Sequence, residues 1–247
     1  MRELAAVDLG VCARLRQVCV RLRAGEITAI CGPNGAGKST LLASLAGLLS
    51  PDSGHVALDG RPLVRLGHAE RARAIGYLPQ SPEVAWDLAV EVLVGLGRLP
   101  WRGAPVDEGQ TAVDAAIAAM DLEMLRHRPV SRLSGGERAR ALMARVLATQ
   151  PAWLLADEPL ASLDLAHAAA LVRRFLDQAQ AGRGVVLVLH DLTMAMNHAD
   201  RVLVLDQGGI AADGAPEAAL APEVIARVWH CQAEWLGPPG AKALSIA

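Results

Sequence analysis

One segment constrains the fold of this chain more than any other: Gly32-Pro33-Asn34-Gly35-Ala36-Gly37-Lys38-Ser39. It matches the pattern G-x-x-x-x-G-K-S/T, which in proteins joins a strand to a helix. The short apolar run Ile27 to Cys31 precedes it, and leucines recur at helical spacing from Leu41 to Leu49, before the turn residues that begin at Ser50. The chain therefore contains a strand, loop and helix unit, and we expect an α/β fold.

Other short apolar runs extend this pattern to a mixed sheet. Strands of a largely parallel sheet are predicted at Ile75 to Leu78, Trp153 to Ala156, Val185 to Leu189 and Val202 to Leu205. An antiparallel addition is predicted from Glu3 to Leu9, Val18 to Leu22 and His55 to Leu58. A hairpin is expected at Gln207-Gly208-Gly209, and a last helix from Pro222 to Trp229.

Between about residues 82 and 150 the strand pattern gives way to helical periodicity, as at Ala139, Leu142, Met143 and Val146. We interpret the chain as a single domain over residues 1–247. Residues 1–81 and 151–247 form an α/β core with antiparallel β additions, and residues 82–150 form an inserted helical subdomain.

Composition excludes several classes of protein. The chain has 247 residues, of which 52% are hydrophobic, but no apolar run approaches the roughly 18 residues that cross a bilayer. The formal net charge is -2, and Lys and Arg are scattered, so we expect no nucleic-acid partner. The four cysteines form no CxxC pair, and a metal site is not expected from them.

The glycine-rich loop suits phosphate chemistry. Its glycines allow backbone N–H groups to turn towards an anion, and the helix that starts near Lys38 adds the partial positive charge of its N-terminus. Lys38 would neutralise the outer phosphates, and the Ser39 hydroxyl would hold Mg²⁺.

Two adjacent carboxylates, Asp157 and Glu158, directly follow the predicted strand that begins at Trp153. In α/β sheets the carboxyl ends of the strands face the ligand. Asp157 suits a hold on Mg²⁺ through water, and Glu158 could orient a water for attack on the γ-phosphate. Without the upstream loop such a pair would more simply be a solvated loop or a helix cap.

A second anion site is predicted at Leu133-Ser134-Gly135-Gly136-Glu137. Ser134 can cap the helix that follows, and the two glycines leave its N–H groups approachable. One chain cannot easily bring both helix ends to one phosphate, but a two-fold dimer can. Standing alone, the segment would be a plain capped helix.

These segments resemble the Walker A, Walker B and LSGGE signature sequences of ABC ATPases, and the resemblance covers nearly the whole chain. It implies an ATPase that dimerises over two Mg-ATP and drives a polytopic membrane permease, served indirectly by a substrate-binding protein, at the cytoplasmic face of the inner membrane. Gln80 resembles the Q-loop, Ser162-Leu163-Asp164 the D-loop and His190 the switch histidine. By that resemblance Glu158, His190 and Lys38 are catalytic, and Ser39, Gln80 and Asp157 hold the metal. The implied ATP contacts are Gly32, Pro33, Asn34, Gly35, Ala36, Gly37, Lys38, Ser39, Thr40, Gln80, Ser134, Gly135, Gly136 and Asp164.

A finer resemblance concerns the transported substrate. Asp87-Leu88-Ala89-Val90, followed by Gly97-Arg98-Leu99-Pro100, is similar to the helical subdomain of importers for iron chelates, haem and cobalamin. The alternative is that Gly97-Arg98 and Pro100 only punctuate two helices. Two other functions stay open: a non-transport ABC ATPase that acts on nucleic acid or ribosomes, and a P-loop kinase.

One departure from the family pattern concerns adenine. ABC ATPases usually carry an aromatic residue upstream of Walker A, whereas residues 1–26 contain no Phe, Tyr or Trp. Arg14 or Arg16 could stack on the base instead. The permease is expected to dock near Gln80 and the segment Ser81 to Val90, where Val84 and Trp86 lie in a loop-like stretch.

Overall fold

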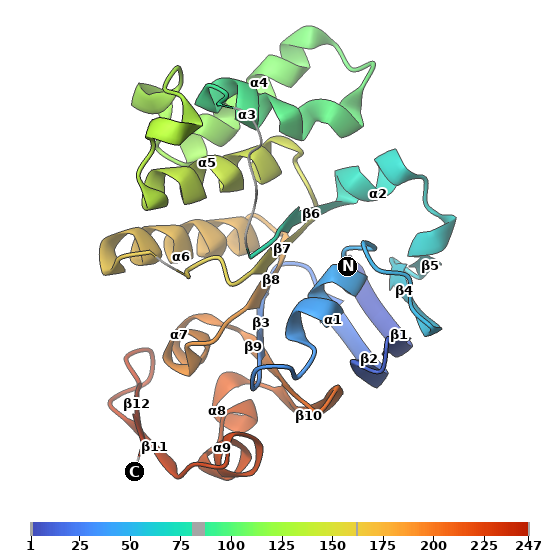
Figure 1. Ribbon diagram of the computed structural model, residues 1–247, viewed down its shortest axis with the longest axis vertical. Helices are drawn as coiled ribbons and strands as arrows, with labels where there is room; N and C mark the ends of the chain where they lie inside the picture. The colour runs from blue at the N-terminus through green and yellow to red at the C-terminus, as the bar shows by residue number, and fades with distance from the viewer. Residues whose placement is uncertain (1, 81–86, 162, 247) are drawn as a thin grey trace.

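A six-stranded sheet in the order β10-β9-β3-β8-β7-β6 organises the chain in the computed structural model, which describes residues 2–80, 87–161 and 163–246 (Figure 1). Its strands pair in parallel, except that the edge strand β10 is antiparallel to β9. The predicted parallel sheet is confirmed, with every predicted strand displaced by at most one residue at either end. The bounds are β3 Ile27–Cys31, β6 Ile75–Leu78, β7 Trp153–Asp157, β8 Gly184–Val188, β9 Arg201–Asp206 and β10 Gly209–Gly214.

Both faces of this sheet are covered, which explains why its central strands β3, β7 and β8 are fully buried and almost continuously apolar. Successive residues point to opposite faces, so Ile27, Ala29 and Cys31 of β3 join one buried cluster and Ile30 joins the other. The first cluster includes side chains of the helical region, and the second includes α1 (Lys38–Leu45) and the antiparallel sheet. The sheet therefore separates two cores, and the loop after β3 emerges between them.

The predicted antiparallel addition is confirmed as a four-stranded sheet in the order β2-β1-β4-β5. Its strands run beyond the predicted limits, and a two-residue strand closes its edge. The bounds are β1 Glu3–Val11, β2 Leu15–Arg23, β4 Ser53–Leu58 and β5 Arg61–Pro62.

Helix α1 is shorter than the leucine spacing predicts. It ends at Leu45 because Gly47, at φ +69°, takes the left-handed conformation that stops a helix. The N–H of Gly47 donates to Ser44 O at 2.8 Å, and that of Leu48 donates to Ala43 O at 2.9 Å. Leu48 and Leu49 are consequently exposed, so the predicted helix extended four residues too far, to Leu49 instead of Leu45.

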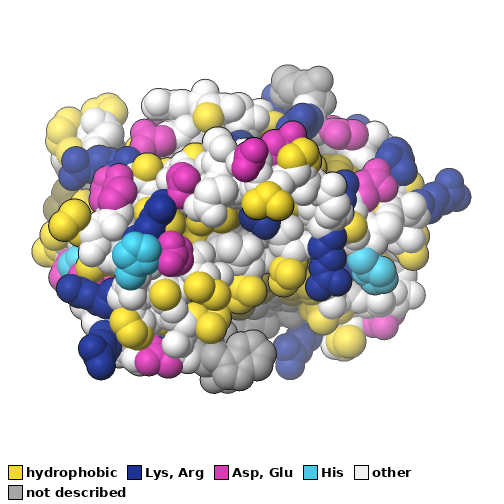
Figure 2. Space-filling view, turned by 90° about the horizontal axis from the view of Figure 1, so that it is seen from above, with side chains coloured by type: hydrophobic (Ala, Val, Ile, Leu, Met, Phe, Trp, Pro, Cys, Tyr) yellow, Lys and Arg dark blue, Asp and Glu magenta, His cyan; other side chains and the backbone are white. Residues whose placement is uncertain are grey.

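The region from residue 87 to residue 150 is helical, and among its described residues the only β pairing is an isolated bridge between Ala89 and Pro129. Gly97 packs directly on a helix backbone, because a Cβ there would lie 2.1 Å from Arg145 O. Gly97 therefore has a packing role beyond punctuation. The elements are α3 Val90–Gly95, η2 Leu96–Trp101, α4 Val106–Ala119, η3 Glu123–Leu125, η4 Val130–Arg132 and α5 Gly135–Ala148. On the face of the molecule seen in Figure 2, basic and acidic side chains are interspersed with apolar ones, without a field of one sign.

The rest of the chain completes the covering layers. The hairpin between β9 and β10 turns through Gln207 and Gly208, both at positive φ, as predicted. The last predicted helix is confirmed, but the small antiparallel sheet that follows it was not foreseen. The remaining elements are η1 Leu63–Arg65, α2 His68–Ala74, α6 Leu165–Gln180, α7 Leu192–His198, α8 Pro216–Ala219, α9 Pro222–Trp229, β11 Ala233–Leu236 and β12 Ala243–Ile246. Within the part of the chain that the structure describes, no helix combines the length and the apolar composition that crossing a membrane requires.

Candidate active site

The glycine-rich loop connects β3 to α1, and close backbone contacts fix its shape. A Cβ on Gly32 would lie 2.2 Å from Leu205 O of β9. A Cβ on Gly37 would lie 2.7 Å from Arg14 O in the turn between β1 and β2, and Gly37 also has φ +101°. These two positions therefore accept only glycine without a shift of the backbone.

Lys38 is buried, and its Nζ donates to Gly32 O at 2.8 Å and to Pro33 O at 3.0 Å. Burial lowers the pKa of this ammonium, whereas the charge of Glu158 opposes that shift. Among the described residues Lys38 forms no ion pair with a carboxylate. An anion inside the loop would therefore contact the Lys38 ammonium, which the backbone carbonyls of Gly32 and Pro33 already orient.

Asp157 is the last residue of β7 and is 4% exposed. Burial raises the pKa of its carboxyl, a hydrogen bond from Ser39 lowers it, and the neighbouring charge of Glu158 raises it. Its Oδ1 atom is buried without a hydrogen-bond partner in the described structure. A buried, unpartnered carboxylate oxygen beside a serine hydroxyl is a donor set that Mg²⁺ prefers, so the residues present fit that ion.

Glu158 is held between residues that follow two other strands. Gln80 Nε2 donates to Glu158 Oε2 at 2.7 Å, and His190 Nε2 donates to Glu158 Oε1 at 2.5 Å. These residues follow β6, β7 and β8 directly or within two positions, so the carboxyl edge of the parallel sheet brings them together. The Glu158 side chain is only 14% exposed, while that of His190 is 45% exposed.

The loop and the carboxylate line one hollow of about 400 Å³. Arg14 reaches it from the turn between β1 and β2, whereas Arg16 does not line it and donates its N–H to Gly208 O at 2.8 Å. Ala36, also predicted to contact the nucleotide, has its side chain in the core and donates its N–H to Pro33 O. The lining residues are Arg14, Asn34, Gly35, Gly37, Lys38, Ser39, Thr40, Glu158 and His190.

The segment Ser134 to Gly136 lies elsewhere. Ser134 caps α5 as predicted, since its Oγ accepts from Glu137 N at 3.3 Å and its own N–H donates to Glu137 Oε2 at 2.8 Å. That backbone hydrogen bond is the main reason why the pKa of Glu137 is lowered. None of Ser134, Gly135 and Gly136 lines the hollow of the glycine-rich loop.

Asp164 is also outside that hollow. It caps α6, and its Oδ1 accepts from His167 N at 2.9 Å and from His167 Nδ1 at 2.8 Å. His167 is a residue that the sequence did not single out, because nothing in a helical pattern marks a histidine that faces another segment. Of the predicted docking segment, Ser81 to Trp86 lies outside the described residues, and Val90 is fully buried.

Comparisons with known proteins show the family. Residues 15–161 match the family model described as ABC transporter. The chain is 47% identical, over 91% of its length and 78% of the relative's, to the hemin import ATP-binding protein HmuV of Nocardia farcinica. It is 44% identical to the protein of the same name from Streptomyces coelicolor, over 97% of this chain and 86% of that one.

Solved structures share the fold. An inward-facing metal-chelate type ABC transporter superposes with a TM-score of 0.84 at 24% identity, over 100% of this chain and 97% of that one. The cbiO1 subunit of a Clostridium perfringens ABC transporter complex superposes with a TM-score of 0.79 at 28% identity, over 91% and 92% of the two chains. The P-loop kinase alternative is therefore excluded, and the chain belongs to the ABC transporter family as one of its ATP-hydrolysing subunits.

Proposed function

We propose that this chain works as a homodimer that hydrolyses two Mg-ATP to drive the uptake of haem, or of a related iron chelate, through a polytopic membrane permease. The observation that carries the chemistry is the position of Glu158, which lines the same hollow as the glycine-rich loop and is held by Gln80 and His190. The relatives named for hemin import support the substrate class and favour transport over a role on nucleic acid.

Each polar residue of the hollow has a distinct task in hydrolysis. Lys38 and the backbone N–H groups of the loop offset the charge of the phosphates. Glu158 accepts a proton from the attacking water, and His190 steadies the carboxylate and the γ-phosphate side of the hollow.

Ser39, Asp157 and Gln80 would hold Mg²⁺, which supplies positive charge for the developing transition state. The Gln80 amide nitrogen already donates to Glu158, so the carbonyl oxygen is the Gln80 atom available to the metal. Asp157 would face the ion with its buried Oδ1, which has no hydrogen-bond partner among the described residues.

The proposed homodimer is supported by what one chain leaves incomplete. Ser134, Gly135 and Asp164 are absent from the hollow within the chain. Around Gly135, a Cβ would meet no described atom within 4 Å, so packing inside the chain does not require glycine there. Glycine costs about 0.5–1 kcal/mol relative to alanine inside a helix. Close approach of a second copy's nucleotide gives the reason for that cost.

Arg14 is the proposed contact for the nucleotide base. It lines the hollow, whereas Arg16 is exposed elsewhere on β2. A guanidinium can stack on any base, and it therefore discriminates among bases less than a shaped aromatic pocket. We expect Arg14 to add affinity rather than selectivity.

The permease is proposed to dock beside Gln80, at the cytoplasmic face of the membrane. Val84 and Trp86, the residues first suggested for this contact, lie outside the described residues. Shortly after that segment, the side chains of Val92, Leu96 and Leu99 are 47%, 36% and 51% exposed. These three apolar residues recur at helical spacing. An exposed apolar row of this kind fits a short amphipathic helix of a membrane partner.

Reconstitution in liposomes tests both substrate and docking. The complex of this chain, its permease and the binding protein should hydrolyse ATP several-fold faster with haem-loaded than with cobalamin-loaded binding protein. Leu99→Asp should uncouple hydrolysis from uptake, whereas Val106→Asp, at a position 86% exposed on α4, should not. Stimulation by cobalamin alone would refute the haem assignment, and equal behaviour of the two variants would refute the docking row.

A further inference from the structure

The ring of His167 lies directly over Gly136. A Cβ on Gly136 would lie 2.5 Å from His167 Cδ2, 2.6 Å from Cγ and 3.0 Å from Nε2. Gly136 is buried, in contrast to its neighbour Gly135, around which that space is open. Glycine is therefore present at the two positions for different reasons. Gly135 faces away from the rest of the chain, whereas Gly136 leaves room for the imidazole of His167.

The other side of the same ring is tied to Asp164. His167 Nδ1 and Asp164 Oδ1 are 2.8 Å apart, and the backbone N–H of His167 donates to the same oxygen at 2.9 Å. Because a carboxylate only accepts, Nδ1 carries the proton, and this bond sets the orientation of the ring. The His167 side chain is 38% exposed and that of Asp164 is 65% exposed, so this pair contributes little stability. Its effect is to fix geometry.

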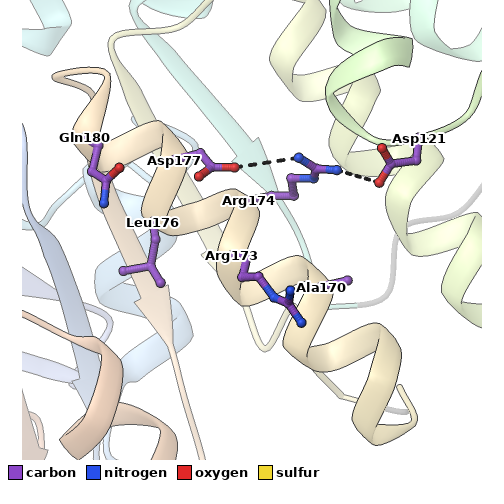
Figure 3. A pocket seen from close by; sticks show the side chains of 7 residues that line it. All are labelled: Asp121, Ala170, Arg173, Arg174, Leu176, Asp177 and Gln180. Carbon is purple, nitrogen blue, oxygen red and sulfur yellow. Dashed lines mark hydrogen bonds and ion pairs between the residues drawn. The ribbon is translucent and has the colours of Figure 1, made fainter. Parts of the chain in front are cut away.

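Helix α6 meets the helical region at a second point, two turns further on. Arg174 lies between Asp121, just after α4, and Asp177, at 2.5 Å and 3.7 Å (Figure 3). Arg140 of α5 donates to the carbonyl oxygen of Met120, the residue before Asp121, at 3.1 Å. Position 167 precedes position 174 by seven residues, so both lie on one face of α6. This second contact fixes α6 relative to α5. The orientation of the His167 ring therefore determines how it packs on Gly136.

We propose that His167 is a positioning residue that holds the Ser134–Gly136 end of α5 in register with Asp164. The proposal rests on the proposed homodimer, in which both segments reach the second copy. With the imidazole in place they approach the second nucleotide as one unit. Without it, each segment approaches in its own position, and closure assembles the site less often.

Steady-state kinetics of the full chain with Mg-ATP test this role. His167→Ala should lower kcat about tenfold and leave KM for ATP within about twofold, because the loop that binds the nucleotide is untouched. His167→Asn keeps a donor near the Nδ1 position and should regain part of the loss. Arg173→Ala, an exposed position on the same helix, is the matched control and should behave as wild type. A wild-type kcat for His167→Ala would overturn the proposal.

Two further measurements separate positioning from a general loss of stability. In a Glu158→Gln background, His167→Ala should raise the dissociation constant of the ATP-bound dimer about tenfold, while ATP affinity of the monomer stays unchanged. Gly136→Ala should be nearly inactive, and adding His167→Ala should restore at least about tenfold of that activity, because the smaller side chain makes room for the new methyl.

If the double variant were no more active than Gly136→Ala, contact with His167 would not be the reason for a glycine at position 136. That result would overturn the packing argument. An unchanged dimer dissociation constant would overturn the positioning role. If the wild-type chain itself formed no ATP-dependent dimer, the proposed function would fail instead, so the two failures are distinguishable.

Discussion

Glu158→Gln isolates the chemistry of the candidate active site from its shape. The amide has nearly the same size as the carboxylate but cannot accept the proton of the attacking water. General-base catalysis contributes about 10²–10⁴-fold, which corresponds to about 2.7–5.4 kcal/mol of barrier at 1.36 kcal/mol for each tenfold change. We therefore expect turnover to fall by at least about a hundredfold at saturating Mg-ATP.

The same substitution should disturb the fold much less. The carboxylate accepts from both Gln80 and His190, and a glutamine can satisfy only one of these donors with its oxygen. Losing one charge-assisted hydrogen bond costs about 1.5–3 kcal/mol. Removing the charge also relieves Asp157, whose pKa burial raises first and Glu158 raises further. The net loss should be about 1–2 kcal/mol, or roughly 2–8 °C in Tm for a chain of this size.

Three assays separate these effects: phosphate release in single turnover, calorimetry of Mg-ATP binding, and gel filtration with Mg-ATP. The variant should bind ATP as wild type does and accumulate as a closed dimer, since trapped ATP cannot leave by hydrolysis. Glu70→Gln, which alters an exposed ion pair with Arg61 on the surface, is the matched control. Turnover within tenfold of wild type would refute the base assignment, and a monomeric variant would refute the shared site.

Three further predictions concern other residues of the candidate active site. Lys38→Ala should remove most Mg-ATP binding in calorimetry, since it deletes the buried cation of the loop; wild-type affinity would contradict the phosphate cradle. The raised pKa of Asp157 means that its ionisation opposes folding, so stability is lost as pH rises from about 3.8 through the raised pKa. Asp157→Asn should therefore gain more stability over wild type in urea unfolding at about pH 7.5 than at about pH 4.5, yet bind Mg-ATP more weakly; an equal gain at both would contradict this. Arg14→Ala should weaken ATP, GTP and CTP binding alike, and competition should show that wild type prefers ATP over CTP by less than about a hundredfold, near 2.7 kcal/mol; a larger preference would reveal a specific adenine contact.

Several features of the fold could be read from the sequence because they depend on local patterns. Five parallel strands followed from continuous apolar runs, since both faces of the sheet are buried. Helix α9 followed from Pro222 at its start, and the hairpin from Gln207 and Gly208 at its turn. The extent of α1 was overestimated because the leucine spacing outweighed Gly47, whose left-handed conformation stops the helix.

By itself, the sequence determined the chemistry available to this protein: a phosphate loop, a strand that ends in two carboxylates, and a capped helix with two glycines. Those elements depend on residues close together in the chain, and short-range physics is enough to recognise them. Which residues meet at the candidate active site depended on the order of the strands, because Gln80, Glu158 and His190 come together only where β6, β7 and β8 end side by side. The choice of Arg14 over Arg16, and the contact of His167 with Gly136, required segments far apart in sequence to pack against each other. Such contacts are set by the packing of whole elements, and no local pattern encodes them.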